Sequence, residues 1–189
     1  MGIYIILIAI ILAAATGFKS TIAMFGYGLA VNLGIMHVSE GMHWVGSPLC
    51  LVLLFLAMIV ELGLGFIPYL DHVFDVVLLP VVIIAGTLMV SSSSSLGETE
   101  PLFRWSLGIL LGGGPAAVSH LCTAFLRGCS TLSTGGLANF LVHLGEIILA
   151  AVTVVIALVI PIIALFLIVA FFGLTLIVYI CTRKEAEAH

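Results

Sequence analysis

Three carboxylates stand in or beside one of the most apolar stretches of the chain, residues 51–80. Glu61 follows a long apolar run, and Asp71 and Asp75 come shortly after it. Asp71 and Asp75 are four positions apart, so on a helix they share one face. A charged side chain at the centre of a bilayer costs about 3 kcal/mol on insertion scales, so such residues usually face the protein interior. The pattern therefore favours three acids that bind a cation or relay protons within a membrane protein.

Each of these acids also has a plainer interpretation. Asp71 can cap the helix that begins near it, and Asp75 can be a first-turn acid favoured by the helix dipole. Glu61 can lie near a short helix end and extend its carboxylate to water. If Glu61 does face the interior, it needs a polar partner, and Arg127, His143 or one of the two aspartates is the expected one.

A second group of polar residues lies in the C-terminal half. His143 and Glu146 are three positions apart in "HLGE" and so share a helix face. That spacing can hold a proton or a metal, although a structural hydrogen bond is the more common use and no metal is assigned. Arg127 and Lys19 are the candidate charge partners: Arg127 can neutralise Glu146 or Glu61, or mark the cytoplasmic edge.

Two segments, residues 17–34 and 118–140, are too polar and too rich in glycine for ordinary membrane spans. Each mixes Gly, Ser and Thr with apolar residues and carries one cation, Lys19 or Arg127. Such segments predict short, broken or re-entrant helices, which membranes tolerate only where protein or a watery cavity covers them. Their candidate binding residues are Ser20, Thr21, Ser133, Thr134, Gly135, Gly136 and Asn139.

The elements that must position these residues follow from the composition. The 189 residues are 63% hydrophobic and 7% charged, whereas soluble domains are about 25% charged. This predicts an all-α, multi-pass membrane protein. The few basic residues and the net charge of −4 argue against nucleic-acid binding. Six apolar runs are candidate spans: residues 3–17, 47–66, 73–92, 104–126, 139–159 and 161–181. The uninterrupted stretch 141–181 must turn back near Pro161, since a single helix of that length would be about twice the bilayer core.

The order of these features predicts an inverted repeat of three spans and three spans. Residues 1–92 form the first unit, 93–103 a polar connecting loop, 104–182 the second unit and 183–189 a solvated tail. In each unit a broken segment precedes a Glu-bearing span, and a proline precedes the last span. The plainer interpretation is that Gly, Ser and Pro recur in any polytopic protein.

The chain resembles the bacterial membrane-protein family catalogued as domain of unknown function 4126. The similarity rests on "ATGFKS", "SPLCLVLLFLAMIVELGLGFIPYLDHVFD", "LPVVIIAGTL", "LLGGG", "LSTGGLANFLVHLGE" and the break at Pro161. The family's acidic series maps onto Glu61, Asp71 and Asp75, and its later Gly, Asn and Glu positions onto Gly136, Asn139 and Glu146. Members often carry Arg where Lys19 stands, and an acid where this chain has Ile147. The resemblance implies a membrane protein and carries no activity.

Three functions compete at this point. In a small transporter or channel-like carrier, the acids bind cations or relay protons and the broken segments hold the substrate. In a non-catalytic accessory or scaffold subunit, the chain packs against a larger complex. An intramembrane enzyme lacks a credible nucleophile and base, since Ser119–His120 and Ser133–His143 are weak pairs. We expect no enzyme activity and no cofactor. We expect a bacterial inner-membrane location with both termini cytoplasmic, and the lipid bilayer with further copies or subunits as partners.

Overall fold

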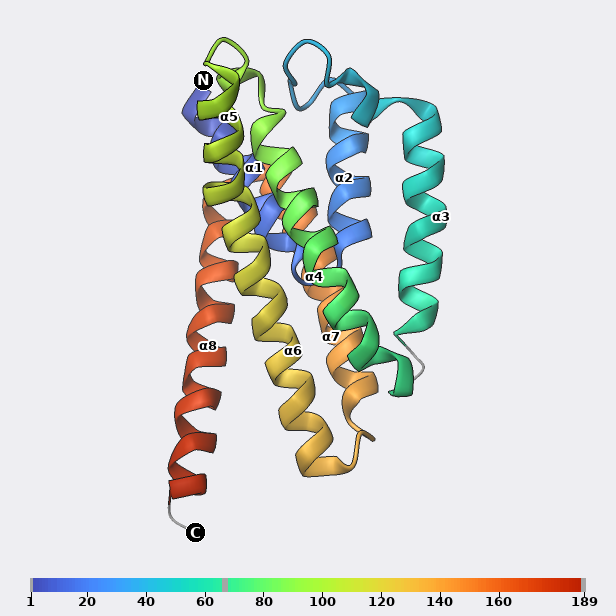
Figure 1. Ribbon diagram of the computed structural model, residues 1–189, viewed down its shortest axis with the longest axis vertical. Coiled ribbons are helices and arrows are strands. Elements are labelled where there is room, and N and C mark those ends of the chain that lie inside the picture. Colours follow the sequence, from blue (N-terminus) through green and yellow to red (C-terminus); the bar gives the residue numbers. More distant parts are fainter. Residues whose placement is uncertain (1, 66–67, 188–189) are drawn as a thin grey trace.

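The computed structural model is a bundle of helices elongated along one axis (Figure 1). It describes the backbone of residues 2–65 and 68–187, but the side chains of residues 68–75 and 185–187 lie outside the description. Asp71 and Asp75 are among them, so the predictions for these two acids fall outside the described side chains. The main helices are α1 (Gly2–Thr16), α2 (Ser20–Asn32), α3 (Pro48–Leu64), α4 (Pro68–Ser91), α5 (Pro101–Gly108), α6 (Gly114–Thr134), α7 (Asn139–Val159) and α8 (Pro161–Glu187).

Helices α1 and α2 form a hairpin that descends only partway into the bundle. They contain 15 and 13 residues, or about 20 Å of helix each, less than the ~30 Å bilayer core. Figure 1 shows α1 running down from one end and α2 returning to that same end. The first predicted break, in residues 17–34, is therefore confirmed as the tip of a helical hairpin, at residues 17–19.

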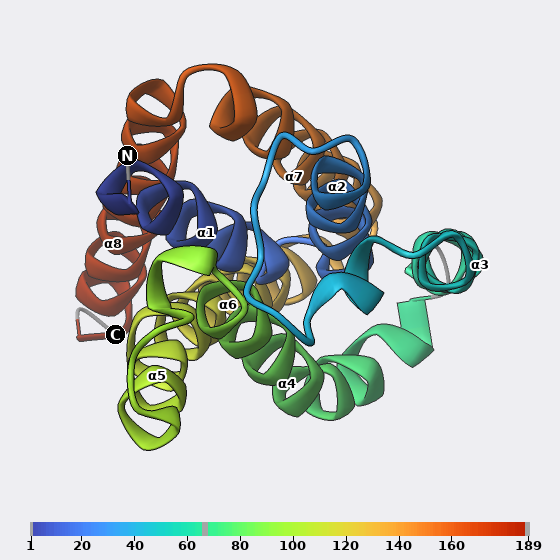
Figure 2. The ribbon, with the colours of Figure 1, turned by 90° about the horizontal axis from the view of Figure 1, so that it is seen from above.

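Helix α1 lies at the centre of the bundle when it is seen from above (Figure 2). Its second half is made of small and apolar residues that are almost fully buried, including Ala13, Ala14 and Ala15. It packs against α2, α4, α6, α7 and α8. Small side chains on this helix allow neighbouring backbones to approach closely, which is how helices associate in an apolar medium.

The remaining helices run roughly along the long axis of the molecule, and α3 and α5 cover only part of it (Figure 1). The stretch Pro101–Thr134 and the helices Asn139–Val159 and Pro161–Lys184 are long and apolar enough to cross a membrane by length and composition. Apolar helices of 10–17 residues occur at Gly2–Thr16, Pro48–Leu64 and Val76–Ser91. The predicted reversal at Pro161 is confirmed: α7 ends at Val159, and α8 begins at Pro161 and packs back along α7.

The second predicted break, in residues 118–140, is largely wrong. Helix α6 continues to Thr134, and the chain turns only at Gly135 and Gly136, whose φ angles are positive, 64° and 90°. Ser and Thr side chains inside α6 bond to carbonyls of the preceding turn, so the helix tolerates them. The backbone departs from α-helical geometry before this stretch, at a π-helical turn over Ile109–Gly113 between α5 and α6.

The directions of the helices do not support a complete inverted repeat. Helices α3 and α7 run in opposite directions, and so do α4 and α8, as the repeat requires (Figure 1). The first matched pair, α1 and the α5–α6 stretch, runs in the same direction, and only α1 turns back halfway. The correspondence therefore fails for the first span of each unit.

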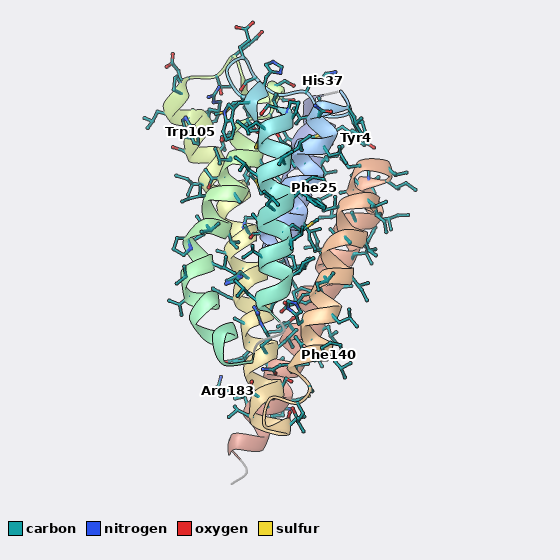
Figure 3. The ribbon with its side chains drawn as sticks, turned by 90° about the vertical axis from the view of Figure 1, so that its right-hand side faces the viewer. Tyr4, Phe25, His37, Trp105, Phe140 and Arg183 are labelled. Carbon is teal, nitrogen blue, oxygen red and sulfur yellow. The ribbon has the colours of Figure 1, made fainter. Side chains whose placement is uncertain are left out.

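The first helix begins and the last helix finishes at opposite ends of the bundle. Helix α1 begins at one end of the long axis and α8 finishes at the other (Figure 1). Figure 3 shows Tyr4, His37 and Trp105 near one end, and Phe140 and Arg183 near the other. The start of α1 and the end of α8 therefore lie at opposite ends of the long axis, and a shared cytoplasmic side for both termini stays a prediction.

The glycines of the π-helical turn let α4 and α6 touch through their backbones. A Cβ added at Gly86 of α4 would lie 2.6 Å from the carbonyl oxygen of Gly112 and 2.8 Å from the Cβ of Ala116. The sequence "LGGGPAA" is thus a packing surface, as its glycines predict. The connecting serines are also packed rather than solvated, since Ser91, Ser92 and Ser93 are all buried.

We expect Gly86→Ala to destabilise the bundle, because the added methyl group must push two backbones apart and overpacking costs about 1–3 kcal/mol. Gly173→Ala on α8 is the matched control, since a Cβ there meets nothing within 4 Å. Thermal unfolding in detergent micelles measures both. Equal unfolding midpoints for the two variants would contradict the close contact of α4 and α6.

Candidate functional site

The tip of the α1–α2 hairpin is buried inside the bundle. Thr16, Phe18, Lys19 and Ser20 are each at most 5% exposed. The last carbonyls of α1 are satisfied locally, by the amide groups of residues 17–19 and by the hydroxyl of Thr16, which donates to Ala13 at 2.6 Å. The α1 end of the tip therefore leaves few backbone groups in need of partners.

The first amides of α2 bind a carboxylate that comes from another helix. Lys19 occupies the N-cap position and its side chain makes no capping hydrogen bond. Instead, Glu61 of α3 accepts the backbone N–H groups of Ser20 at 3.2 Å and Thr21 at 2.9 Å. The hydroxyls of Ser20 and Thr21 also donate to its two oxygens. An anion is favoured here because the N–H groups of a helix start point outward and carry partial positive charge.

These contacts change the predicted partner of Glu61. The interior-facing orientation agrees with the prediction, and its carboxylate is bound by Ser20 and Thr21 at the start of α2. Arg127, one of the expected partners, forms its described ion pair with Glu146. Ser20 and Thr21 were expected to bind substrate; in this structure they bind an acid of the same chain.

A cluster of three buried charges lies beside this capped helix. The Lys19 Nζ is 3.0 Å from one oxygen of Glu146, and the Arg127 Nε is 3.2 Å from the other. All three side chains are about 95% buried. Lys19 comes from the hairpin tip, Arg127 from α6 and Glu146 from α7, so the cluster joins three elements. Arg127 is thus a charge in the interior of the protein, paired with Glu146.

His143 lies one turn before Glu146 on α7 and is fully buried. Its Nε2 is 3.3 Å from the carbonyl oxygen of Leu62, one residue beyond Glu61. This contact ties α7 to the end of α3. The ring nitrogen donates to a carbonyl, so this is a structural hydrogen bond, but its partner lies on α3, whereas the "HLGE" spacing predicts a bond to Glu146.

Two cavities meet these polar groups from different sides. One, of about 350 Å³, lies between α2, α3, α4 and α6 and is lined by Lys19, Ser20, Thr21, Glu61 and Arg127 together with apolar side chains. The other, of about 650 Å³, lies between α6, α7 and α8 and reaches Glu146. Lys19 and Arg127 therefore face the first cavity, and the carboxylate that pairs with them faces the second.

The other predicted binding residues lie apart from this cluster. Ser133, Thr134, Gly135 and Gly136 are in the last turn of α6 and the turn that follows it, and none lines either cavity. The Thr134 hydroxyl accepts the backbone N–H of Ala138 at 3.1 Å, which closes this turn.

Asn139 begins α7, and its amide donates to the Thr131 hydroxyl at 2.9 Å. These residues shape the connection between α6 and α7.

Sequence reasoning missed two residues that hold the hairpin tip. Thr123 of α6 donates to the carbonyl of Gly17 at 3.4 Å, and Phe171 of α8 packs edge-to-face on Phe18 with ring centroids 4.8 Å apart. Both also line the larger cavity. No spacing signal identifies them, because they lie more than one hundred positions from the tip.

Among the residues whose side chains are described, no group of three or more His, Cys, Asp or Glu side chains is placed to hold a metal ion.

Comparisons with known proteins give one match. The model of the family described as "Domain of unknown function (DUF4126)" matches residues 6–180. Searches of the curated proteins and of the solved structures found no match.

We expect Glu146→Gln to destabilise the protein by about 3–5 kcal/mol, because it leaves two buried cations without their shared carboxylate. Glu98→Gln, at an exposed acid in a loop, is the control. Unfolding by a denaturing detergent in mixed micelles measures both. Adding Lys19→Met to Glu146→Gln should recover part of the loss, since it removes one unpaired cation. A Glu146→Gln variant as stable as Glu98→Gln would show that the cluster contributes nothing.

Proposed function

The chain belongs to the DUF4126 family, whose description assigns no activity, and from that premise we propose that it is a small membrane transporter or channel-like carrier. Intramembrane carboxylates, chiefly Glu61 and Glu146, bind a cation or relay protons in it. The observation that supports the proposal most directly is the re-entrant hairpin whose tip lies among buried charges beside a cavity. Half-length helices that end at mid-depth next to polar groups are a recurring device of transporters.

Glu61 is the group whose state this mechanism depends on. Its carboxylate holds α3 against the start of α2 through Ser20 and Thr21. A proton or cation that binds to the Glu61 carboxylate weakens its hydrogen bonds from the N–H groups of Ser20 and Thr21, because a neutralised acid is a poorer acceptor. Helix α3 and the hairpin tip then separate more readily, and the cavity between them opens.

The charged cluster supplies the fixed side of the site. Lys19, Arg127 and Glu146 are almost fully buried, and keeping three charges in such a place is costly unless they pair. Their pairing holds the hairpin tip against α6 and α7. A movement of α3 relative to this fixed frame is a gating step in which the charges need not leave the interior.

The distribution of basic residues sets the orientation that we propose. Arg183 and Lys184 are near the C-terminal end of α8, whereas Arg104, which precedes Trp105 at the opposite end, follows Glu98 and Glu100 closely in the sequence (Figure 3). Under the positive-inside rule, the end with Arg183 and Lys184 faces the cytoplasm of a bacterial inner membrane. The start of α1 then faces the other side.

In vesicles that contain the purified protein, Glu61→Gln should reduce proton or cation flux about tenfold or more, because the amide cannot carry the charge that the site needs. A pH-sensitive dye trapped inside the vesicles, under an imposed proton or cation gradient, measures the flux. Glu40→Gln, at an exposed acid in the loop after α2, is the matched control and should leave the flux unchanged.

Size-exclusion chromatography and the unfolding midpoint of each variant separate loss of flux from loss of fold. Glu61→Asp adds a second check, since it keeps the charge but shortens the reach to Ser20 and Thr21. Flux in Glu61→Gln equal to that of the parent would refute the role of Glu61. No flux in the parent with any of a broad set of ions and small solutes would refute transport.

The alternative is a non-catalytic accessory or scaffold subunit, and the placement of α3 is the observation that favours it. None of the described residues of α3 is buried, and the helix stands at the outside of the bundle (Figure 2). A helix this exposed has room for a second copy or another subunit to pack on it. Both functions are non-enzymatic, in line with the absence of a credible nucleophile and base in the sequence. Cross-linking in native membranes, with cysteines placed on α3, distinguishes a subunit interface from a lipid-facing helix.

A further inference from the structure

The cavity beside Glu61 has a polar end and an apolar end. Lys19, Ser20, Thr21, Glu61 and Arg127 gather where the hairpin tip enters. The rest of the lining is apolar and comes from α3 and α4, including Ala57, Val60, Leu64, Leu78 and Val81. Because α3 is the outermost helix in Figure 2, this apolar part borders the hydrocarbon that surrounds the protein. Water and small ions gain nothing from such a wall, whereas an alkyl chain does.

The polar end offers donors to a ligand more than acceptors. Both oxygens of Glu61 already accept from Ser20 and Thr21, through two backbone N–H groups and two hydroxyls. The Lys19 ammonium has three N–H donors, and its described partner is a single oxygen of Glu146. Of the three residues of the charged cluster, Lys19 and Arg127 line this cavity, whereas Glu146 lines the other one. A head group that accepts hydrogen bonds and carries negative charge complements this end.

We propose that the cavity between α2, α3 and α4 binds an anionic amphiphile: an acidic head group at Lys19 and one alkyl chain between α3 and α4. This rests on the proposed function and names the class of its substrate, which is distinct from the proton or cation that acts on Glu61. A carboxylate and a phosphate monoester share the required chemistry.

The volume limits the size of the ligand. A cavity of about 350 Å³ is at the small end of the range of ligand sites. A ligand atom group the size of a water molecule occupies roughly 30 Å³, so the cavity holds about a dozen such groups. A head group and part of one chain fill it, and the rest of a longer chain extends past α3 into lipid.

Native mass spectrometry of the whole protein, released from a non-ionic polyoxyethylene detergent, tests this by counting bound molecules. We expect dodecyl phosphate or dodecanoate to bind as a single saturable molecule. Dodecyltrimethylammonium should bind about tenfold more weakly or worse, because its head group meets Lys19 and Arg127 and has no N–H donor to offer Glu61, whose oxygens already accept from Ser20 and Thr21. Inorganic phosphate, which has the head group without the chain, should not bind. Comparison of the two anionic amphiphiles shows which acid the site prefers.

Two alanines supply a matched pair of variants. Ala57→Phe places a ring in the proposed site, and because Ala57 is exposed the change should not disturb folding. It should weaken binding of dodecyl phosphate about tenfold or more. Ala151→Phe fills a different apolar cavity, between α2 and α7, at an equally exposed alanine, and should leave binding unchanged.

Equal binding of the cationic amphiphile, binding of inorganic phosphate alone, or full binding in Ala57→Phe would each overturn the proposal. The flux measurement in vesicles tests transport independently of amphiphile binding. Flux of small ions without amphiphile binding removes this substrate class and leaves transport standing. Binding that Ala57→Phe abolishes, in a protein without flux, supports the site and counts against transport.

Discussion

The first N–H groups of α2 are the constraint on which this fold depends. They lie at the tip of a hairpin, where no preceding helical turn can accept them. The local sequence offers no acceptor, because the N-cap residue is Lys19. Glu61 from α3 accepts them instead. The position of α3, which buries none of its described residues, therefore depends strongly on polar contacts near its C-terminal end, those of Glu61 and the bond from His143 to the Leu62 carbonyl.

Lys19 adds a second demand at the same place. A cation next to the positive end of a helix is unfavourable unless an anion is close to it. Glu146 meets this demand and also pairs with Arg127, so the hairpin tip is joined electrostatically to α6 and α7. Close packing supports the arrangement: a Cβ at Gly17 would lie 2.5 Å from the carbonyl of Ala116. The tip can reach the cluster because glycine stands there.

Much of the helical framework could be predicted from the sequence, because apolar runs and prolines act locally. The break after Thr16 and the reversal at Pro161 are examples. The continuity of α6 could not, since hydroxyls that favour turns in water instead bond within the helix. The prediction of an inverted repeat rested on the order of the broken segments, the glutamates and the prolines along the chain. That order does not show that the chain reverses after α1 halfway along the bundle, whereas α6 continues.

The residues of the candidate site were mostly identified, but the pairing among them was not. Glu61, Lys19, Arg127 and Glu146 stand out because charges are rare in this chain, whereas pairing depends on which helices meet. Glu61 lies about forty positions from Ser20 and Thr21, and a carboxylate can bind backbone N–H groups that no sequence pattern marks. The acid that completes the hairpin also lines the cavity. A ligand that enters beside Glu61 therefore acts on the contact that keeps α3 in place, so occupancy of the cavity and the position of α3 are coupled by linkage.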